Sequence, residues 1–423
     1  MSNSSIYALD NAAKIFPPTS GKRDTKVFRF SCELVEDVDP DFLQKALDRT
    51  IEEFPIYRSS LRQGLFWYYL RETPVRPVAR EESAPPCSAI YNVNKYNLLF
   101  EVTYFQSRIN LEVYHALTDG TGALQFLKTL VYYYITLKYQ DEFSSIPAND
   151  YDASFSQKAE DSFQKYYVRG KKRKQEHIRA YKIHNFELPD GRIKIIEGML
   201  SVKKLLEKAH EHHTTMSVFL ASIFLCAINN QAPLRKKKRP IVLTVPVNLR
   251  NYFHSESARN FFCTIDVRYN FSSQPSDLAC VIEEIDRQFK QLLTPENLAA
   301  RMNSFSAIEH NAFARVVPLF LKNFVLGIAG RLGARESTGS ISNIGRITMP
   351  EGFERYIRMF DVFISTEKVQ ACVCSYLDTL TISFTSAFHS TDIQKDFFRM
   401  LSGMGLDITI ATNQIYEEDG STI

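Results

Sequence analysis

The stretch Arg108-Ile-Asn-Leu-Glu-Val-Tyr-His-Ala-Leu-Thr-Asp-Gly-Thr-Gly122 carries most of the information about fold and function. Its first half alternates as a strand does, so His115 shares one face with Ile109, Leu111 and Val113. The imidazole therefore stands on the apolar side of the strand, at the point where the strand ends. An imidazole at the mouth of an apolar interior titrates near neutrality and can act as a general base.

Asp119 and Gly120 follow in the turn, and a helix is predicted from Gly122 to about Tyr139. A carboxylate beside His115 can hold such a loop in shape by pairing with an arginine. Two plainer interpretations stay open at this point. His115 could be a hydrogen-bonded core residue, and Asp119 could be no more than the N-cap of the following helix.

Periodic segments on both sides of this stretch predict a mixed α/β protein. Asp39 is a good N-cap, Pro40 suits the first helical position, and Pro55 ends the helix that they begin. Other helices are predicted over 202–210, 217–228, 278–293 and 391–404. Strands are predicted over 27–34, 64–71, 98–104, 108–114, 193–200, 241–247 and 380–386, and near Ile341 and Val362.

The chain is too long for one ordinary core, because 423 residues exceed the roughly 150 typical of a domain. A polar, weakly periodic segment runs from Gln140 to Ile183. We therefore predict two α/β lobes, each a mixed sheet with helices, over residues 1–160 and 185–423, joined by a linker over 161–184.

Composition excludes several other classes of protein. The 51 basic and 48 acidic residues leave a net charge of +3, too small for a dedicated nucleic-acid binder. The seven cysteines are odd in number and contain no C-x-x-C pair, so neither a metal site nor a disulfide framework is predicted. The longest mostly apolar run, Met216–Ile228, is shorter than the roughly 20 residues that a bilayer requires. No signal peptide is visible, and a cytoplasmic protein is expected.

His115-Ala-Leu-Thr-Asp119-Gly120, between a strand and a helix, resembles the active-site motif of the CoA-dependent acyltransferase superfamily. This superfamily includes chloramphenicol acetyltransferase, plant BAHD acyltransferases, alcohol acetyltransferases and the condensation domains of peptide synthetases. Val245-Pro-Val-Asn-Leu-Arg250 and Arg259-Asn260-Phe-Phe262 resemble its second-lobe pattern. The opening segments Tyr7-Ala-Leu-Asp10 and Phe28-Arg29-Phe30 are most similar to bacterial alcohol acetyltransferase-like members.

The resemblance implies an acyl transfer in a tunnel between the lobes. His115 would be the general base for an alcohol or amine that attacks an acyl thioester directly. Acyl-CoA would be the co-substrate, with no permanently bound cofactor. Asp119 would be structural and pair with an arginine, for which Arg250 is the candidate, and Gly120 would permit the tight turn.

Departures from the family's patterns bear on the substrates. Condensation domains usually carry a histidine where this chain has Tyr114, which favours a free small-molecule acceptor over a carrier-bound one. Two alternatives remain: a carrier-protein-dependent enzyme of natural-product assembly, and a non-catalytic binding or assembly protein of the same fold. Basic runs at 169–174 and 235–239 are either solvated loops or contacts for CoA phosphates or an acidic carrier protein. Candidates for substrate binding or for an oxyanion donor are Asn260, Asn343, Thr385 and Ser386.

Overall fold

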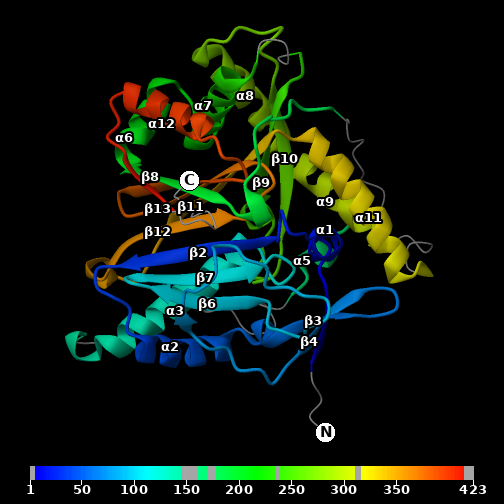
Figure 1. The fold of residues 1–423 in the computed structure, drawn as a ribbon, viewed down its shortest axis with the longest axis vertical. Helices are drawn as coiled ribbons and strands as arrows, with labels where there is room; N and C mark the ends of the chain where they lie inside the picture. Colours follow the sequence, from blue (N-terminus) through cyan, green and yellow to red (C-terminus); the bar gives the residue numbers. More distant parts are fainter. Residues whose placement is uncertain are drawn as a thin grey trace.

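A computed structural model describes residues 5–143, 148, 160–168, 178–233, 238–309 and 316–413 of the chain. Its ribbon shows two sheets lying one above the other, with helices on the outer side of each (Figure 1). Each lobe has a hydrophobic core of its own. The predicted two-lobed α/β class is confirmed.

The first lobe is built on a five-stranded sheet with the order β12-β2-β7-β6-β5, in which the edge strand β12 (Ile357–Ile364) comes from late in the sequence. Helices α2 and α3 pack together and cover its outer face (Figure 1). A small sheet, β1-β4-β3, lies beside it. The bounds are β1 (Ile6–Ala8), α1 (Phe16–Thr19), β2 (Val27–Leu34), α2 (Pro40–Glu53), β3 (Ser59–Gln63), β4 (Tyr68–Glu72), β5 (Arg80–Glu81), β6 (Phe100–Phe105), β7 (Arg108–Tyr114) and α3 (Gly120–Lys138).

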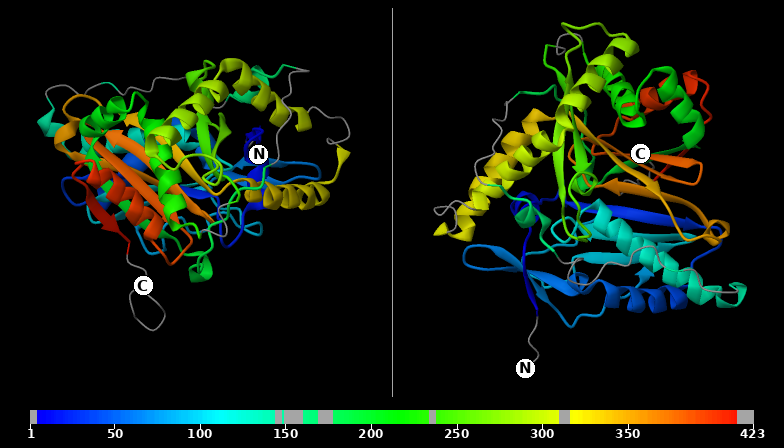
Figure 2. Two further views of the ribbon diagram at one scale, coloured as in Figure 1. Left: turned by 90° about the horizontal axis from the view of Figure 1, so that it is seen from above. Right: turned by 180° about the vertical axis from the view of Figure 1, so that it is seen from behind.

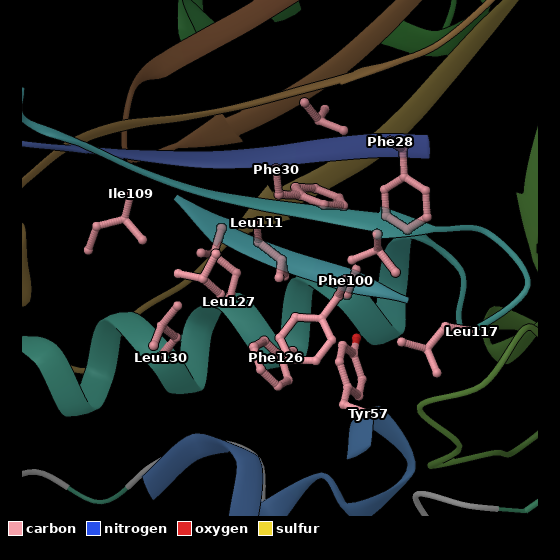
Figure 3. Close-up of a cluster of buried hydrophobic side chains, with 14 of the residues drawn as sticks. Phe28, Phe30, Tyr57, Phe100, Ile109, Leu111, Leu117, Phe126, Leu127 and Leu130 are labelled. Carbon is pink, nitrogen blue, oxygen red and sulfur yellow. The ribbon is translucent and has the colours of Figure 1, made fainter. Parts of the chain in front are cut away.

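The core of this lobe lies between the sheet and α3. Figure 3 shows Leu111 from β7 facing Leu127 and Phe126 from α3, with Tyr57 and Phe100 closing the cluster. The Tyr57 and Phe126 rings are stacked with centroids 4.2 Å apart. Burying side chains of this size contributes about 1.5–3 kcal/mol each, so this packing fixes where β7 ends and α3 begins.

The second lobe is built on a seven-stranded mixed sheet with the order β10-β9-β11-β13-β14-β8-β15. Helices α6, α7, α8 and α12 lie on its outer face (Figures 1 and 2). The bounds are α5 (Ser162–Lys165), β8 (Lys194–Ser201), α6 (Val202–Glu211), α7 (Met216–Gln231), β9 (Ile241–Asn248), β10 (Phe262–Tyr269), α8 (Leu278–Leu292), α9 (Pro295–Glu309), α11 (Leu319–Gly333), β11 (Gly339–Ile347), β12 (Ile357–Ile364), β13 (Val369–Tyr376), β14 (Thr379–Ser386), α12 (Asp392–Gly403) and β15 (Thr409–Thr412).

Most of the expected elements form where the local signals place them. Asp39 caps α2 by accepting hydrogen bonds from the Asp41 and Phe42 N–H groups, and Pro40 takes the first helical position. One expected boundary was wrong. Gly64 lies in the turn of the β3–β4 hairpin, where its N–H donates to the Trp67 carbonyl, rather than in a strand. Helix α11, which was not among the predicted helices, ends at Gly333.

Strand β12 joins the two lobes. It lies late in the sequence, yet it pairs with β2 at the edge of the first lobe's sheet. The same strand packs against β13 and β14 of the second sheet. The lobe boundaries at residues 160 and 185 stay a prediction, because the chain between them is described only in part.

Candidate active site

His115 directly follows β7 and lines a cavity of about 460 Å³ between the two lobes. Its backbone N–H donates to the Lys26 carbonyl at 2.9 Å, which extends the pairing of β7 with β2 by one residue. The imidazole stacks on Phe16 with centroids 4.4 Å apart, and Phe28 meets it edge-on at 4.9 Å. The ring is therefore held in place by aromatic side chains, and it is not sealed in the core.

A chain of hydrogen bonds sets the tautomer of His115. Asn260 Nδ2 donates to Asp10 Oδ2 at 3.2 Å, so Asn260 Oδ1 is the atom that faces His115 Nδ1, also at 3.2 Å. An amide oxygen only accepts, so Nδ1 carries the proton and Nε2 keeps its lone pair. Asn260 was expected to bind substrate or an oxyanion; the structure places it behind the imidazole, where it positions the ring.

Burial shifts the pKa values of His115 and Asp10, the two titratable groups at the ends of this chain of hydrogen bonds. Burial lowers the pKa of His115 below its ordinary value near 6.5, and the Asp119 carboxylate opposes that shift without cancelling it. The ring is therefore neutral at pH 7. Burial also raises the pKa of Asp10 to about 6, against the opposing charge of Arg259, whose Nη2 lies 3.7 Å from Asp10 Oδ2. At pH 7 Asp10 is ionised and accepts from Asn260.

Asp119 ties the first lobe to the second. Its Oδ1 accepts from the Gly122 N–H at 3.0 Å, which caps α3. Its Oδ2 accepts from Arg250 Nη1 at 2.8 Å and from the Phe261 N–H at 2.7 Å. Arg250 is the arginine expected from the family resemblance, and its other N–H groups donate to backbone carbonyls including that of Ser257. Asp119 is thus both the N-cap of α3, through Oδ1, and the ion-pair partner of Arg250, through Oδ2.

Gly120 and Gly122, the two glycines after Asp119, have different structural roles. Gly120 is not among the glycines with positive φ, so its expected role in permitting a tight turn was wrong. A Cβ on Gly120 would reach Ile344 Cδ1 at 3.4 Å, at the cavity wall. A Cβ on Gly122 would overlap the Ala258 carbonyl oxygen and Thr118 Oγ1. Gly122, which sequence reasoning missed, is therefore needed for the close approach of the two lobes.

Replacing Gly122 by alanine should destabilise the fold more than the same change at Gly120. The Ala258 carbonyl belongs to the backbone and cannot move aside, so overpacking should lower the free energy of unfolding by about 2–3 kcal/mol. Gly120→Ala is the matched control, because Ile344 is a flexible side chain and alanine favours helix. Urea denaturation of both variants checks this, and equal stabilities would contradict it.

The remaining candidates are split between the cavity and the core. Asn343 lines the cavity, and its Oδ1 accepts from the Gly345 N–H at 2.9 Å across a bulge in β11. Thr385 and Ser386 are buried in β14 and do not line this cavity. The reason is sheet order: β13 lies between β14 and β11, which was not visible in the sequence. The structure therefore does not bring these two hydroxyls to the cavity that His115 lines.

Apolar side chains form most of the cavity wall. Asp119 is the one charged residue among the described residues that line it, and its charge is already paired with Arg250. The wall includes Phe28, Phe30, Leu220, Val245, Val247, Phe262, Phe289, Leu293, Ile341, Ile344, Val362, Ile364 and Val373.

The described parts of the chain contain no cluster of three or more His, Cys, Asp or Glu side chains that could hold a metal ion. They also contain no helix with the length and apolar character needed to cross a membrane.

Solved structures share this fold over nearly the whole chain. No family model matches the sequence, and no curated protein matches it. Trichothecene 15-O-acetyltransferase from Fusarium sporotrichioides is 12% identical, with a TM-score of 0.62 over 94% of this chain and 93% of that one. Polyketide synthase associated protein 5 from Mycobacterium tuberculosis is 15% identical, with a TM-score of 0.61 over 95% and 98%. The starter condensation domain of rhizomide synthetase, in a complex with C8-CoA and Leu-SNAC, is 13% identical, with a TM-score of 0.61 over 94% of each chain.

These neighbours confirm the resemblance to the acyltransferase and condensation superfamily at the level of the fold. At 12–15% identity they do not assign substrates or site residues to this chain.

Proposed function

We propose that this protein transfers an acyl group from an acyl thioester, acyl-CoA in the first instance, to a hydroxyl or amine. The observation that carries the proposal is the state of His115. The ring is neutral, its Nδ1–H is engaged by Asn260, and no described residue forms a hydrogen bond with its Nε2 beside the cavity. A structural core histidine would have both ring nitrogens satisfied by the protein.

The reaction follows from this arrangement. The acceptor O–H or N–H gives its proton to His115 Nε2 as its heavy atom bonds to the thioester carbonyl carbon. The tetrahedral intermediate then collapses, the carbon–sulfur bond breaks, and the imidazolium returns the proton to the departing thiolate. The Asp10 carboxylate, acting through Asn260, favours the imidazolium that forms in the first step. No covalent intermediate with the protein is required.

The cavity wall indicates the substrates. A charged group buried there would have no free partner, since the Asp119 charge is already matched by Arg250. We therefore expect an uncharged acyl chain and an acceptor that is uncharged around its reacting group. The charged part of CoA would have to lie outside the cavity. Of the two basic runs suggested for this contact, residues 169–174 and 235–237 lie outside the described residues.

A panel of acyl-CoAs and acceptors tests the proposal. Purified protein is mixed with acetyl-CoA or longer acyl-CoAs and with a series of alcohols and amines, and release of free thiol is followed. Acceptor-dependent thiol release is the expected result. Release only from an acylated carrier protein would favour the condensation-type alternative instead. Binding of acyl-CoA without turnover for any pair would indicate a non-catalytic member of the fold.

Replacing Asp10 by asparagine tests the chain of hydrogen bonds behind His115. The Ala13 N–H donates to Asp10 Oδ1 at 2.8 Å and should keep the amide oxygen of the new asparagine at that position, so its NH2 group takes the place of Oδ2. An NH2 group cannot accept from Asn260 Nδ2, so the Asn260 amide should turn over and donate to His115 Nδ1. That moves the ring proton to Nε2 and blocks the base. We expect kcat to fall by about 10–100-fold with KM nearly unchanged, the size of effect typical of a residue that orients another.

The double variant Asp10→Asn/Asn260→Asp is the control for this prediction. It restores an acceptor opposite His115 Nδ1 and a donor at position 10, so kcat should recover much of its loss. Thermal unfolding of both variants shows whether they remain folded. An Asp10→Asn enzyme with the kcat of the parent, or a double variant no faster than the single one, would contradict the assignment.

A further inference from the structure

The exposed side of α11 is unusually apolar. Most surface helices turn their large apolar residues toward the core. Here the inner side of α11 carries glycines that let it approach α1: Gly327 faces the Pro18 carbonyl oxygen, and Gly330 faces Thr19. The large side chains point outward, with Phe320 69% and Phe324 68% exposed. Figures 1 and 2 show α11 at the edge of the molecule, away from both sheets.

The β3–β4 hairpin extends this apolar surface. The Leu319 N–H donates to the Leu65 carbonyl at 2.9 Å, and Lys322 Nζ donates to the Phe66 carbonyl at 2.9 Å. The helix and the hairpin tip are thus joined by hydrogen bonds. We call the exposed apolar residues of the helix and the hairpin tip, together with Val316 just before the helix, the α11 surface: Leu65, Phe66, Val316, Phe320, Leu321, Phe324, Val325, Ile328 and Leu332.

The charged residues of α11 itself and of the two positions after it are all cationic. The segment 319–335 contains Lys322, Arg331 and Arg335 and no aspartate or glutamate, and the first acidic residue after it is Glu336. Arg331 and Arg335 are exposed, and neither forms an ion pair with a described residue. A second copy of the chain docked by two-fold symmetry would place this patch, with its cationic margin, against another copy of the same patch. An occupant with negative charge beside an apolar layer fits better.

We propose that the α11 surface docks the protein on an anionic lipid bilayer. Exposed Phe and Leu side chains with Arg at the margin are typical of helices that lie in the plane of a membrane interface. The 15 residues of α11 extend about 22 Å, which is short of the roughly 30 Å hydrocarbon layer, so the helix lies along the surface and does not enter it end-on. This inference does not depend on the proposed acyl transfer, because it concerns binding alone.

The single tryptophan of the chain provides a reporter at this surface. Trp67 is half-buried next to the hairpin tip, with Lys322 Nζ 3.4 Å from its ring centroid. The full-length protein is titrated with phosphatidylcholine vesicles, with and without phosphatidylglycerol. We expect a blue shift of Trp67 emission and co-sedimentation with the vesicles that contain phosphatidylglycerol. Added salt should weaken this binding.

Two sets of variants separate the apolar and the electrostatic contributions. Phe320→Ser/Phe324→Ser should weaken vesicle binding by at least about 10-fold, because each phenylalanine loses an apolar contact and little else. Arg331→Gln/Arg335→Gln should weaken binding to anionic vesicles about 10-fold and leave binding to neutral ones unchanged. The matched control is Phe186→Ser, which removes an equally large and more exposed ring (84%) from another part of the chain.

The outcomes are distinct. Loss of binding in both double variants and its retention in Phe186→Ser would support the proposal. Binding that survives Phe320→Ser/Phe324→Ser would overturn it. So would a parent protein that ignores the vesicles and sediments as a dimer that the same variant dissociates, because a second copy would then cover the surface. Thiol release measured in the same samples reports separately on the proposed enzyme.

Discussion

Replacing His115 by alanine is expected to lower kcat/KM for thiol release by about 100-fold or more, because the chain loses its general base. The protein should stay folded, since the ring stacks on Phe16 and meets Phe28 edge-on, and the hydrogen bond from the backbone N–H of residue 115 to the Lys26 carbonyl remains in the variant. The measurement is acyl transfer with the best pair from the substrate panel, together with a melting curve. Unchanged turnover would remove His115 from the mechanism.

The pH profile gives a second readout for the same residue. Burial lowers the pKa of His115, so the base form persists below pH 6.5, and the acid limb of kcat/KM should lie below that value. The residual activity of His115→Ala should lose this limb. A merely structural histidine would leave the shape of the profile unchanged when it is replaced.

Local signals in the sequence were sufficient for most of the elements and for part of the site. The alternation from Ile109 to Val113 placed His115 at the end of a strand, and Asp39 marked the start of α2. These features depend on neighbours within a few residues. The pairing of Asp119 with Arg250 was expected only because the chain resembles a family, as 131 residues separate the two.

The rest of the site depends on contacts that no local pattern encodes. Asp10 lies 250 residues from Asn260, and Asn260 lies 145 residues from His115. Asp10 stood in the quoted opening segment, but nothing in its spacing indicated a role. The order of strands in a sheet is equally non-local. The sequence therefore led us to expect Thr385 and Ser386 at the site, whereas the structure places them in the core. The helix α11 was missed because its apolar residues face outward and do not follow the pattern of a surface helix.

Replacing Asp119 by alanine is expected to lower the free energy of unfolding by about 3–5 kcal/mol, as for a buried ion pair that loses one partner. Asp119 is 4% exposed, and its loss strands the Arg250 guanidinium and the N–H groups of Gly122 and Phe261. The matched control is Asp48→Ala at the exposed Asp48–Arg76 pair, which should cost less than about 1 kcal/mol. Urea denaturation measures both, and equal losses would contradict the assignment.

The same change should also slow acyl transfer, for a reason that the structure makes specific. Asp119 holds the Phe261 N–H, and Phe261 is next in sequence to Asn260, the residue that positions His115. Without the hydrogen bond from the Phe261 N–H to Asp119, the Asn260 amide should be less well positioned, and kcat should fall even at temperatures where the variant is folded. Asp119→Ala/Arg250→Met removes the stranded cation as well, so it should regain stability relative to Asp119→Ala without regaining kcat. A double variant that recovers both would mean that Asp119 serves stability alone.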